Sequence, residues 1–106
     1  MGRWIEIARV GQVPPGTSVV VVDGDEAIAL FNVGGAFHAI DNRCPHAGAS
    51  LADGDLEGTT VHCPFHGWTF DVVTGVCAVA RSARVHCFPV KVEGDRVLVE
   101  LGTRPR

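Results

Sequence analysis

Two short clusters of cysteine and histidine constrain this chain more than any other feature. Cys44-Pro45-His46 is followed by Cys63-Pro64-Phe65-His66, with sixteen residues between His46 and Cys63. Two thiolates and two imidazoles form a donor set that suits either a zinc ion or an iron–sulfur cluster. A fold that uses all four donors at one site must bring two separate loops together.

The way the donors are distributed separates the two kinds of metal site. Zinc fingers usually keep both cysteines in one C-x(2–4)-C knuckle and both histidines in another. Here each cluster carries one of each, as C-x-H and then C-x-x-H. This mixed pairing favours iron, and a structural zinc-binding module is the alternative.

The clusters, together with the segment Gly67-Trp68-Thr69-Phe70-Asp71 that follows them, resemble the Rieske [2Fe-2S] family. In a Rieske centre two histidines replace two cysteines on one of the two irons. The resemblance therefore implies one [2Fe-2S] cluster as the cofactor. It implies that Cys44 and Cys63 bind one iron and that His46 and His66 bind the other.

The rest of the chain is patterned as short β-strands. Apolar and polar residues alternate between turn residues such as Pro14-Pro15-Gly16 and Gly34-Gly35, and no stretch of ten residues has a helical period. Strands are expected at 4–9, 18–22, 26–32, 36–40, 56–62, 67–72, 90–92 and 97–101. The pattern predicts an all-β domain, a small antiparallel sandwich or barrel with the ligand loops at one end.

The family resemblance sharpens this expectation into a Rieske fold that occupies residues 1–106 as a single domain. Residues 1–40 and 86–106 are expected to form a β-sandwich base. Residues 41–85 are expected to form an inserted, rubredoxin-like cluster-binding subdomain.

The residues around the ligands bear on the reduction potential. High-potential members of the family brace the loops with a disulfide and add serine and tyrosine hydroxyls as hydrogen-bond donors to sulfur. Ala49, Phe65, Trp68 and Phe70 stand at those positions here, and the chain has no tyrosine. The expected centre has a low potential, with hydrogen bonds to sulfur supplied by backbone amides of the glycine- and proline-containing loops.

The sequence favours an electron carrier over an enzyme. It has no G-x-G-x-x-G nucleotide motif, and the forty residues after His66 are too few for the mononuclear-iron domain of a Rieske oxygenase subunit. The resemblance implies a ferredoxin that takes electrons from an NAD(P)H-dependent flavoprotein reductase and passes them to a terminal aromatic-ring oxygenase, with His46 and His66 on the exit path. The alternative is the small subunit of an NADH-dependent nitrite reductase.

Charge and hydropathy limit the other classes of partner. A formal net charge of −3 argues against nucleic-acid binding. The acidity either keeps the protein dispersed or steers it to basic patches on redox partners. No apolar run exceeds five residues, so no membrane span is expected. We expect a cytoplasmic, monomeric shuttle.

Five further residues are expected to be structural. Cys77 and Cys87 are predicted to be small buried apolar residues rather than a disulfide, because the expected compartment is reducing. His38, His62 and His86 lie in apparent strands and are predicted to pack there rather than bind metal.

The residues that flank the ligand clusters have two interpretations each. Trp68 either shields the cluster from water or is simply part of the core. Arg43, Asp53, Asp55 and Glu57 either contact a redox partner or form solvated surface.

Overall fold

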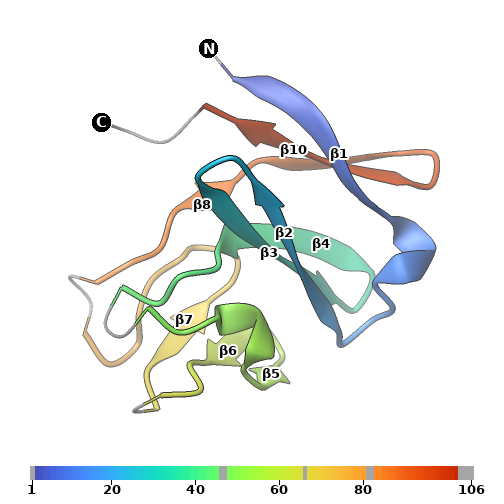
Figure 1. The fold of residues 1–106 in the computed structure, drawn as a ribbon. Helices are drawn as coiled ribbons and strands as arrows, with labels where there is room; N and C mark the ends of the chain where they lie inside the picture. The colour runs from blue at the N-terminus through green and yellow to red at the C-terminus, as the bar shows by residue number, and fades with distance from the viewer. Residues whose placement is uncertain (1, 46–47, 66, 81–82, 103–106) are drawn as a thin grey trace.

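The structure, a computed structural model, describes residues 2–45, 48–65, 67–80 and 83–102 of the 106-residue chain. These ranges contain ten β-strands, two short 3-10 helices and no α-helix (Figure 1). In chain order the elements are β1 (Arg3–Arg9), η1 (Val10–Gln12), β2 (Ser18–Asp23), β3 (Glu26–Val33), β4 (Ala36–Asp41), η2 (Leu51–Asp53), β5 (Leu56–Glu57), β6 (Thr60–His62), β7 (Thr69–Asp71), β8 (Cys87–Phe88), β9 (Val90–Glu93) and β10 (Arg96–Leu101).

The strands form three antiparallel sheets. The first has the order β1-β10-β9, the second β2-β3-β4-β8 and the third β5-β6-β7. The first sheet pairs the two ends of the chain, with Arg3 opposite Leu101. The third sheet lies at the bottom of Figure 1, and the first at the top. The predicted all-β, antiparallel architecture is confirmed.

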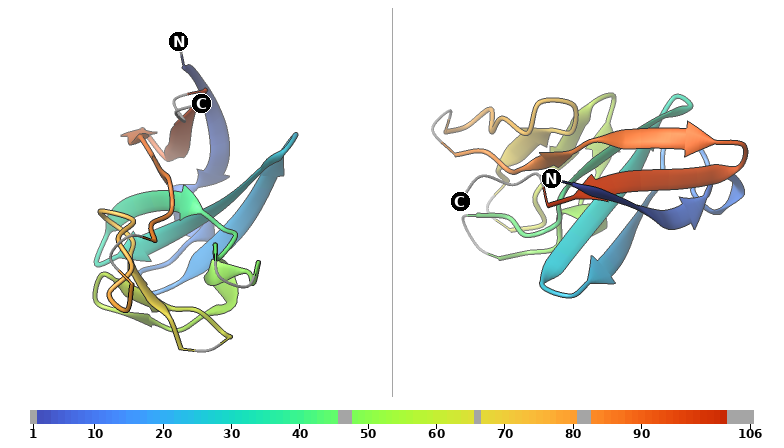
Figure 2. Two further views of the ribbon diagram at one scale, coloured as in Figure 1. Left: turned by 90° about the vertical axis from the view of Figure 1, so that its left-hand side faces the viewer. Right: turned by 90° about the horizontal axis from the view of Figure 1, so that it is seen from above.

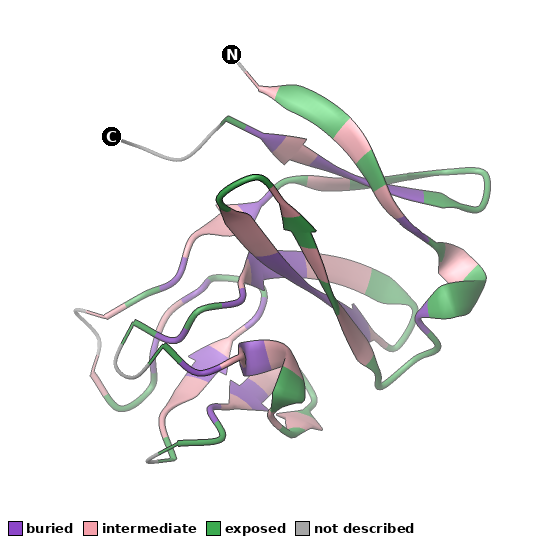
Figure 3. Cartoon of the chain, viewed as in Figure 1, coloured by how far each residue is buried: buried purple, intermediate pink, exposed green. Residues whose placement is uncertain are grey.

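The second sheet is covered on both faces, and β3 shows this most clearly. Ile28 and Leu30 belong to a core shared with the first sheet, whereas Ala29 and Phe31 belong to a core shared with the third. All four are fully buried, as the purple centre of β3 shows in Figure 3. A strand buried on both faces carries apolar residues at successive positions, which explains why β3 lacks a polar face.

Two expectations about strands need correction. The expected strand over 56–62 is two strands, β5 and β6, because Gly58 takes a φ of 58° and turns the chain between them. The sequence pattern does not predict strand β8. It is only two residues long, Cys87 and Phe88, and its pairing partners on β4, Ile40 and Ala39, lie far away in sequence.

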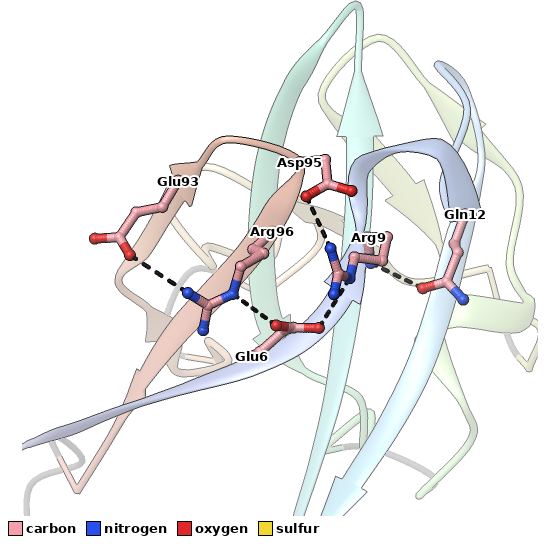
Figure 4. Close-up of polar contacts among 6 residues, drawn as sticks. All are labelled: Glu6, Arg9, Gln12, Glu93, Asp95 and Arg96. Carbon is pink, nitrogen blue, oxygen red and sulfur yellow. Dashed lines mark hydrogen bonds and ion pairs between the residues drawn. The ribbon is translucent and has the colours of Figure 1, made fainter.

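A cluster of charged side chains ties β1 to the turn between β9 and β10 (Figure 4). Glu6 accepts a hydrogen bond of 2.7 Å from Arg96 and lies 3.2 Å from Arg9, which in turn contacts Asp95 at 2.8 Å. The Arg9 backbone amide donates to Gln12 on η1. The cluster lies on the first sheet, away from the third.

The cysteines and histidines outside the ligand clusters differ in burial and in their contacts. Cys77 is fully buried as predicted, whereas Cys87 is only half-buried, and both are free thiols. His38 lies half-buried in β4. His62, in β6, pairs with Glu57 at 2.7 Å, and His86 packs its ring edge-on against Phe88 at 4.8 Å.

The described part of the chain has no helix that is long and apolar enough to cross a membrane.

Candidate metal centre

The two ligand loops are built on the same local plan. Each begins with Cys-Pro and has glycine at its fifth position, Gly48 with φ 68° and Gly67 with φ 70°. Residues other than glycine rarely adopt a positive backbone φ of this size. In each loop the backbone amide of the cysteine donates to the carbonyl of the sixth residue. These bonds are 2.9 Å from Cys44 to Ala49 and 2.6 Å from Cys63 to Trp68. The repeated hydrogen bond presents both cysteines in the same way.

The thiols of Cys44 and Cys63 meet in the interior. Their residues are only 1% and 4% exposed, and the side chains hydrogen-bond to each other. Burial raises the pKa of the Cys63 thiol above its ordinary value of 9.0, and the contact with Cys44 raises it further. The Cys63 thiol is therefore held in its protonated form in the metal-free protein, and metal binding must displace that proton.

A backbone amide also points at one of these sulfurs. The Phe65 N–H donates to the Cys63 thiol and acts on its pKa in the downward direction, opposite to the effect of burial. Such a donor stabilises negative charge on sulfur. One amide of this loop therefore provides the kind of hydrogen bond that the sequence predicts for these loops.

Of the four predicted ligands, the structure describes and brings together the two cysteines. His46 and His66 lie outside the described residues. Two buried thiols that converge from the first positions of two matching loops fit the cysteine half of an iron–sulfur centre. They also share one apolar cluster, which limits access of water.

Asn42 supports the first loop, and the sequence analysis does not include it among the candidate functional residues. It is 7% exposed, and its side-chain oxygen accepts a 2.9 Å hydrogen bond from the Ala52 amide, while its side-chain nitrogen donates to Ser50. These bonds join the start of the loop to η2. The residue type is the sequence signal that could point to Asn42, because a short polar residue at the end of a strand often hydrogen-bonds to nearby backbone groups.

The residues that flank the loops are divided between core and surface. Trp68 is half-buried and packs against the cluster that contains both cysteines, in agreement with its interpretation as part of the core. The charged residues Arg43, Asp53, Asp55 and Glu57 are all exposed. Two apolar side chains are exposed nearby in sequence, Phe65 at 55% and Val79 at 62%.

Comparison with known proteins decides the family. The Rieske [2Fe-2S] domain model matches residues 3–89. The chain belongs to the Rieske [2Fe-2S] family. This Rieske domain is 40% identical over 102 residues to the ferredoxin component of a naphthalene 1,2-dioxygenase system from Pseudomonas aeruginosa, covering 93% of this chain and 96% of that protein.

Solved structures agree with the Rieske assignment. A chain from the complex of reduced oxygenase and oxidized ferredoxin in carbazole 1,9a-dioxygenase matches with a TM-score of 0.85 and 35% identity over 91% of both chains. A putative NADH-dependent nitrite reductase small subunit from Mycobacterium tuberculosis matches with a TM-score of 0.86 and 26% identity, over 94% of this chain and 96% of that one.

The Rieske protein is an electron-transfer ferredoxin with one Rieske-type [2Fe-2S] cluster, and it is not itself a catalytic enzyme. The family assignment also decides between the two metals that the donor set allowed. It favours the iron–sulfur cluster over the structural zinc-binding module.

Proposed function

We propose that this Rieske ferredoxin carries single electrons from an NAD(P)H-dependent flavoprotein reductase to a terminal oxygenase that acts on aromatic rings. The observation that carries the proposal is the 40% identity, over 93% of the chain, to a ferredoxin of a naphthalene 1,2-dioxygenase system. The similarity to a chain from the carbazole 1,9a-dioxygenase complex of oxygenase and ferredoxin supports an oxygenase as the electron acceptor.

For the site, we propose that Cys44 and Cys63 bind one iron and that His46 and His66 bind the other. The buried, mutually hydrogen-bonded thiols support the cysteine half. The positions of the histidines in the matching Cys-Pro loops support the other half. When bound, the cluster supplies a reversible one-electron step. Cys44 and Cys63 would hold their half of the cluster in the buried interior, away from water. We propose that the electron leaves through the half that His46 and His66 would hold.

We further propose that residues 41–85 form the cluster-binding subdomain and that residues 1–40 and 86–106 form the base. The third sheet, which includes β5, β6 and β7, falls wholly within the first of these ranges. The strands of the first and second sheets lie within residues 1–40 and 86–106, apart from Asp41 at the end of β4. We expect this protein to act as a cytoplasmic monomer.

We propose that the reduction potential is low, near the lower end of the range for Rieske centres at roughly −150 mV. Hydroxyl donors and a bracing disulfide raise the potential in other members of the family. Ala49, Phe65, Trp68 and Phe70 provide neither, and the described cysteines are all free. The remaining donors to sulfur are backbone amides such as that of Phe65.

The ligand proposal is tested by Cys44→Ser and His66→Ala. Both variants are expected to lose the iron–sulfur absorbance and NADH-driven reduction through the flavoprotein reductase of a naphthalene dioxygenase system. Their β-sheet circular dichroism is expected to remain, because the base has its own core. Cys87→Ala is the matched control and retains reduction. Full electron transfer in either ligand variant would show that the assignment is wrong.

The second candidate function is the small subunit of an NADH-dependent nitrite reductase, which the similarity to the Mycobacterium tuberculosis protein favours. Adding the purified protein to a nitrite reductase large subunit distinguishes the two. Restored nitrite reduction supports the second candidate, whereas support of aromatic-ring oxidation by an oxygenase supports the first.

A further inference from the structure

The two ligand loops are closed at their bases in different ways. The second loop is the tip of the hairpin of β6 and β7, and strand pairing between His62 and Thr69 closes it. The first loop follows β4, but η2 comes after it instead of a strand, and the pairing at its base is an isolated bridge between Arg43 and Ser50. The described residues of both loops lie at the left-hand end of the molecule in Figure 1, the end that faces the viewer in the left-hand panel of Figure 2.

The side chain of Asn42 strengthens the base of the first loop, where a partner strand is lacking. Its nitrogen donates to the Ser50 hydroxyl at 2.9 Å, and its oxygen accepts a 2.9 Å bond from the Ala52 amide on η2. The Asn42 carbonyl also accepts a 2.8 Å bond from the Leu51 amide. Asn42 is 7% exposed, so removing its side chain would leave buried polar groups without a partner. One side chain therefore closes the first loop and holds η2.

The turn η2 connects this link to the second loop. Gly54, which follows η2, lies so close to the His62 carbonyl that a Cβ atom would collide with it. The Asp55 carbonyl accepts a 2.8 Å bond from the His62 amide, and His62 directly precedes Cys63. Tightly packed interiors transmit strain instead of absorbing it. A displacement at the base of the first loop is therefore expected to reach the second ligand cysteine.

We propose that Asn42 is a positioning residue of the redox centre, which sets the separation of the two ligand loops through η2. The inference rests on the proposed ligands, because Asn42 lies two residues before Cys44 and η2 holds the residue before Cys63. A cluster that joins two loops changes its coordination geometry when their separation changes. Groups that orient metal ligands tune the metal in this way.

Asn32 supplies a matched control. It is the other asparagine of the chain, it is 3% exposed, and its side chain donates to the Val13 carbonyl and accepts from the Gly35 amide, in the base. Asn42→Leu and Asn32→Leu each replace the amide with an apolar group of the same branched shape. Asn42→Ala repeats the first change with a smaller side chain, in case leucine does not fit.

Two further substitutions identify the hydrogen bond that matters. Asn42→Asp keeps an oxygen acceptor for the Ala52 amide. Ser50→Ala removes the partner of the Asn42 nitrogen and leaves the bond from Ala52 in place. Both variants are expected to preserve the link from the first loop to η2.

The readouts are the EPR g values of the reduced protein and hydrogen exchange of the oxidised protein, followed by mass spectrometry. For Asn42→Leu and Asn42→Ala we expect shifted g values, and loss of the cluster to an iron chelator about tenfold faster, the smaller of the effects that removing a supporting group has on metal affinity. We also expect faster exchange in residues 54–62. Asn42→Asp, Ser50→Ala and Asn32→Leu are expected to keep the original g values and the original exchange in this segment.

Three results would overturn the inference. The first is Asn42→Leu with unchanged g values and unchanged exchange in residues 54–62, even if its stability falls as far as that of Asn32→Leu. The second is Asn42→Asp with the same g shift as Asn42→Leu, and the third is Ser50→Ala with that shift, because the bond from Ala52 would then not be the link. Failure of the proposed function is a separate result, since the unsubstituted protein would then give no Rieske signal, whereas hydrogen exchange needs no cluster.

Discussion

Gly54 offers a sharp test of how the second ligand loop is positioned. It follows η2 and lies against β6, where a Cβ atom would fall well inside 3.0 Å of the His62 carbonyl oxygen and 3.3 Å from that of Leu51. His62 directly precedes Cys63. Gly54 has a φ of −83° and a ψ of 166°, an extended conformation that alanine adopts readily. Gly54→Ala therefore introduces a collision and no backbone strain.

The cost of this collision can be estimated from its surroundings. Overpacking a tightly packed region costs about 1–3 kcal/mol, and the upper end applies because the obstacle is backbone and cannot rotate away. Replacing glycine also stiffens the unfolded chain, which returns about 0.4–1 kcal/mol. The net loss in unfolding free energy is expected to be about 2 kcal/mol.

The assay is urea unfolding under anaerobic, reducing conditions, followed by tryptophan fluorescence, for Gly54→Ala and for Gly11→Ala. Gly11 is the matched control, since a Cβ there has nothing within 4 Å. We expect Gly11→Ala to remain within about 0.5 kcal/mol of the original protein. Iron content after purification is expected to fall only in Gly54→Ala. Equal stability and iron content for the two variants would refute the proposed close packing of Gly54 against His62.

Three further predictions concern stability. The hydrogen bond from Arg96 is the main reason that the pKa of Glu6 lies below its ordinary value of 4.5. The contribution of Glu6 to the unfolding free energy is therefore present above pH 4.5 and is lost as the pH falls through the lower folded pKa. In Glu6→Gln, the unfolding free energy measured against pH should fall less steeply in acid. Burial raises the pKa of the Cys87 thiol above its ordinary value of 9.0. The unfolding free energy should therefore fall as the pH rises beyond 9 toward the folded pKa. Cys87→Ala should show a shallower fall of the unfolding free energy over this alkaline range in the same titration. Phe70→Ala should lower the unfolding free energy in urea by about 3–5 kcal/mol, because Phe70 is fully buried in the apolar cluster that contains Cys44 and Cys63. A loss below about 1 kcal/mol would contradict its place in that core.

The features that the sequence predicts well are local ones. The hairpins around β2, β3 and β4 follow from short runs of apolar, often β-branched residues bounded by turn residues, as at Gly34-Gly35. The shared Cys-Pro start of the ligand loops is also a local pattern. It is enough to identify the cysteine pair that the structure brings together.

The features that the sequence does not predict depend on distant parts of the chain. Strand β8 forms because Cys87 and Phe88 pair with β4. A segment of two residues is too short to show a periodic pattern of apolar residues in the sequence. The role of Asn42 depends on the Ala52 amide, ten residues away on η2. The Cys77 sulfur accepts a hydrogen bond from the Ala80 amide because the loop after it folds back, which an isolated cysteine does not reveal.

The central claim is that this chain is a low-potential Rieske ferredoxin, and a redox titration of the purified protein followed by EPR tests it most directly. We expect a signal only in the reduced state, with an average g below the free-electron value, that appears at about −100 mV or lower. A signal that appears well above 0 mV would contradict the low potential. A sample that contains zinc or no iron, and gives no signal, would contradict the electron-transfer function itself.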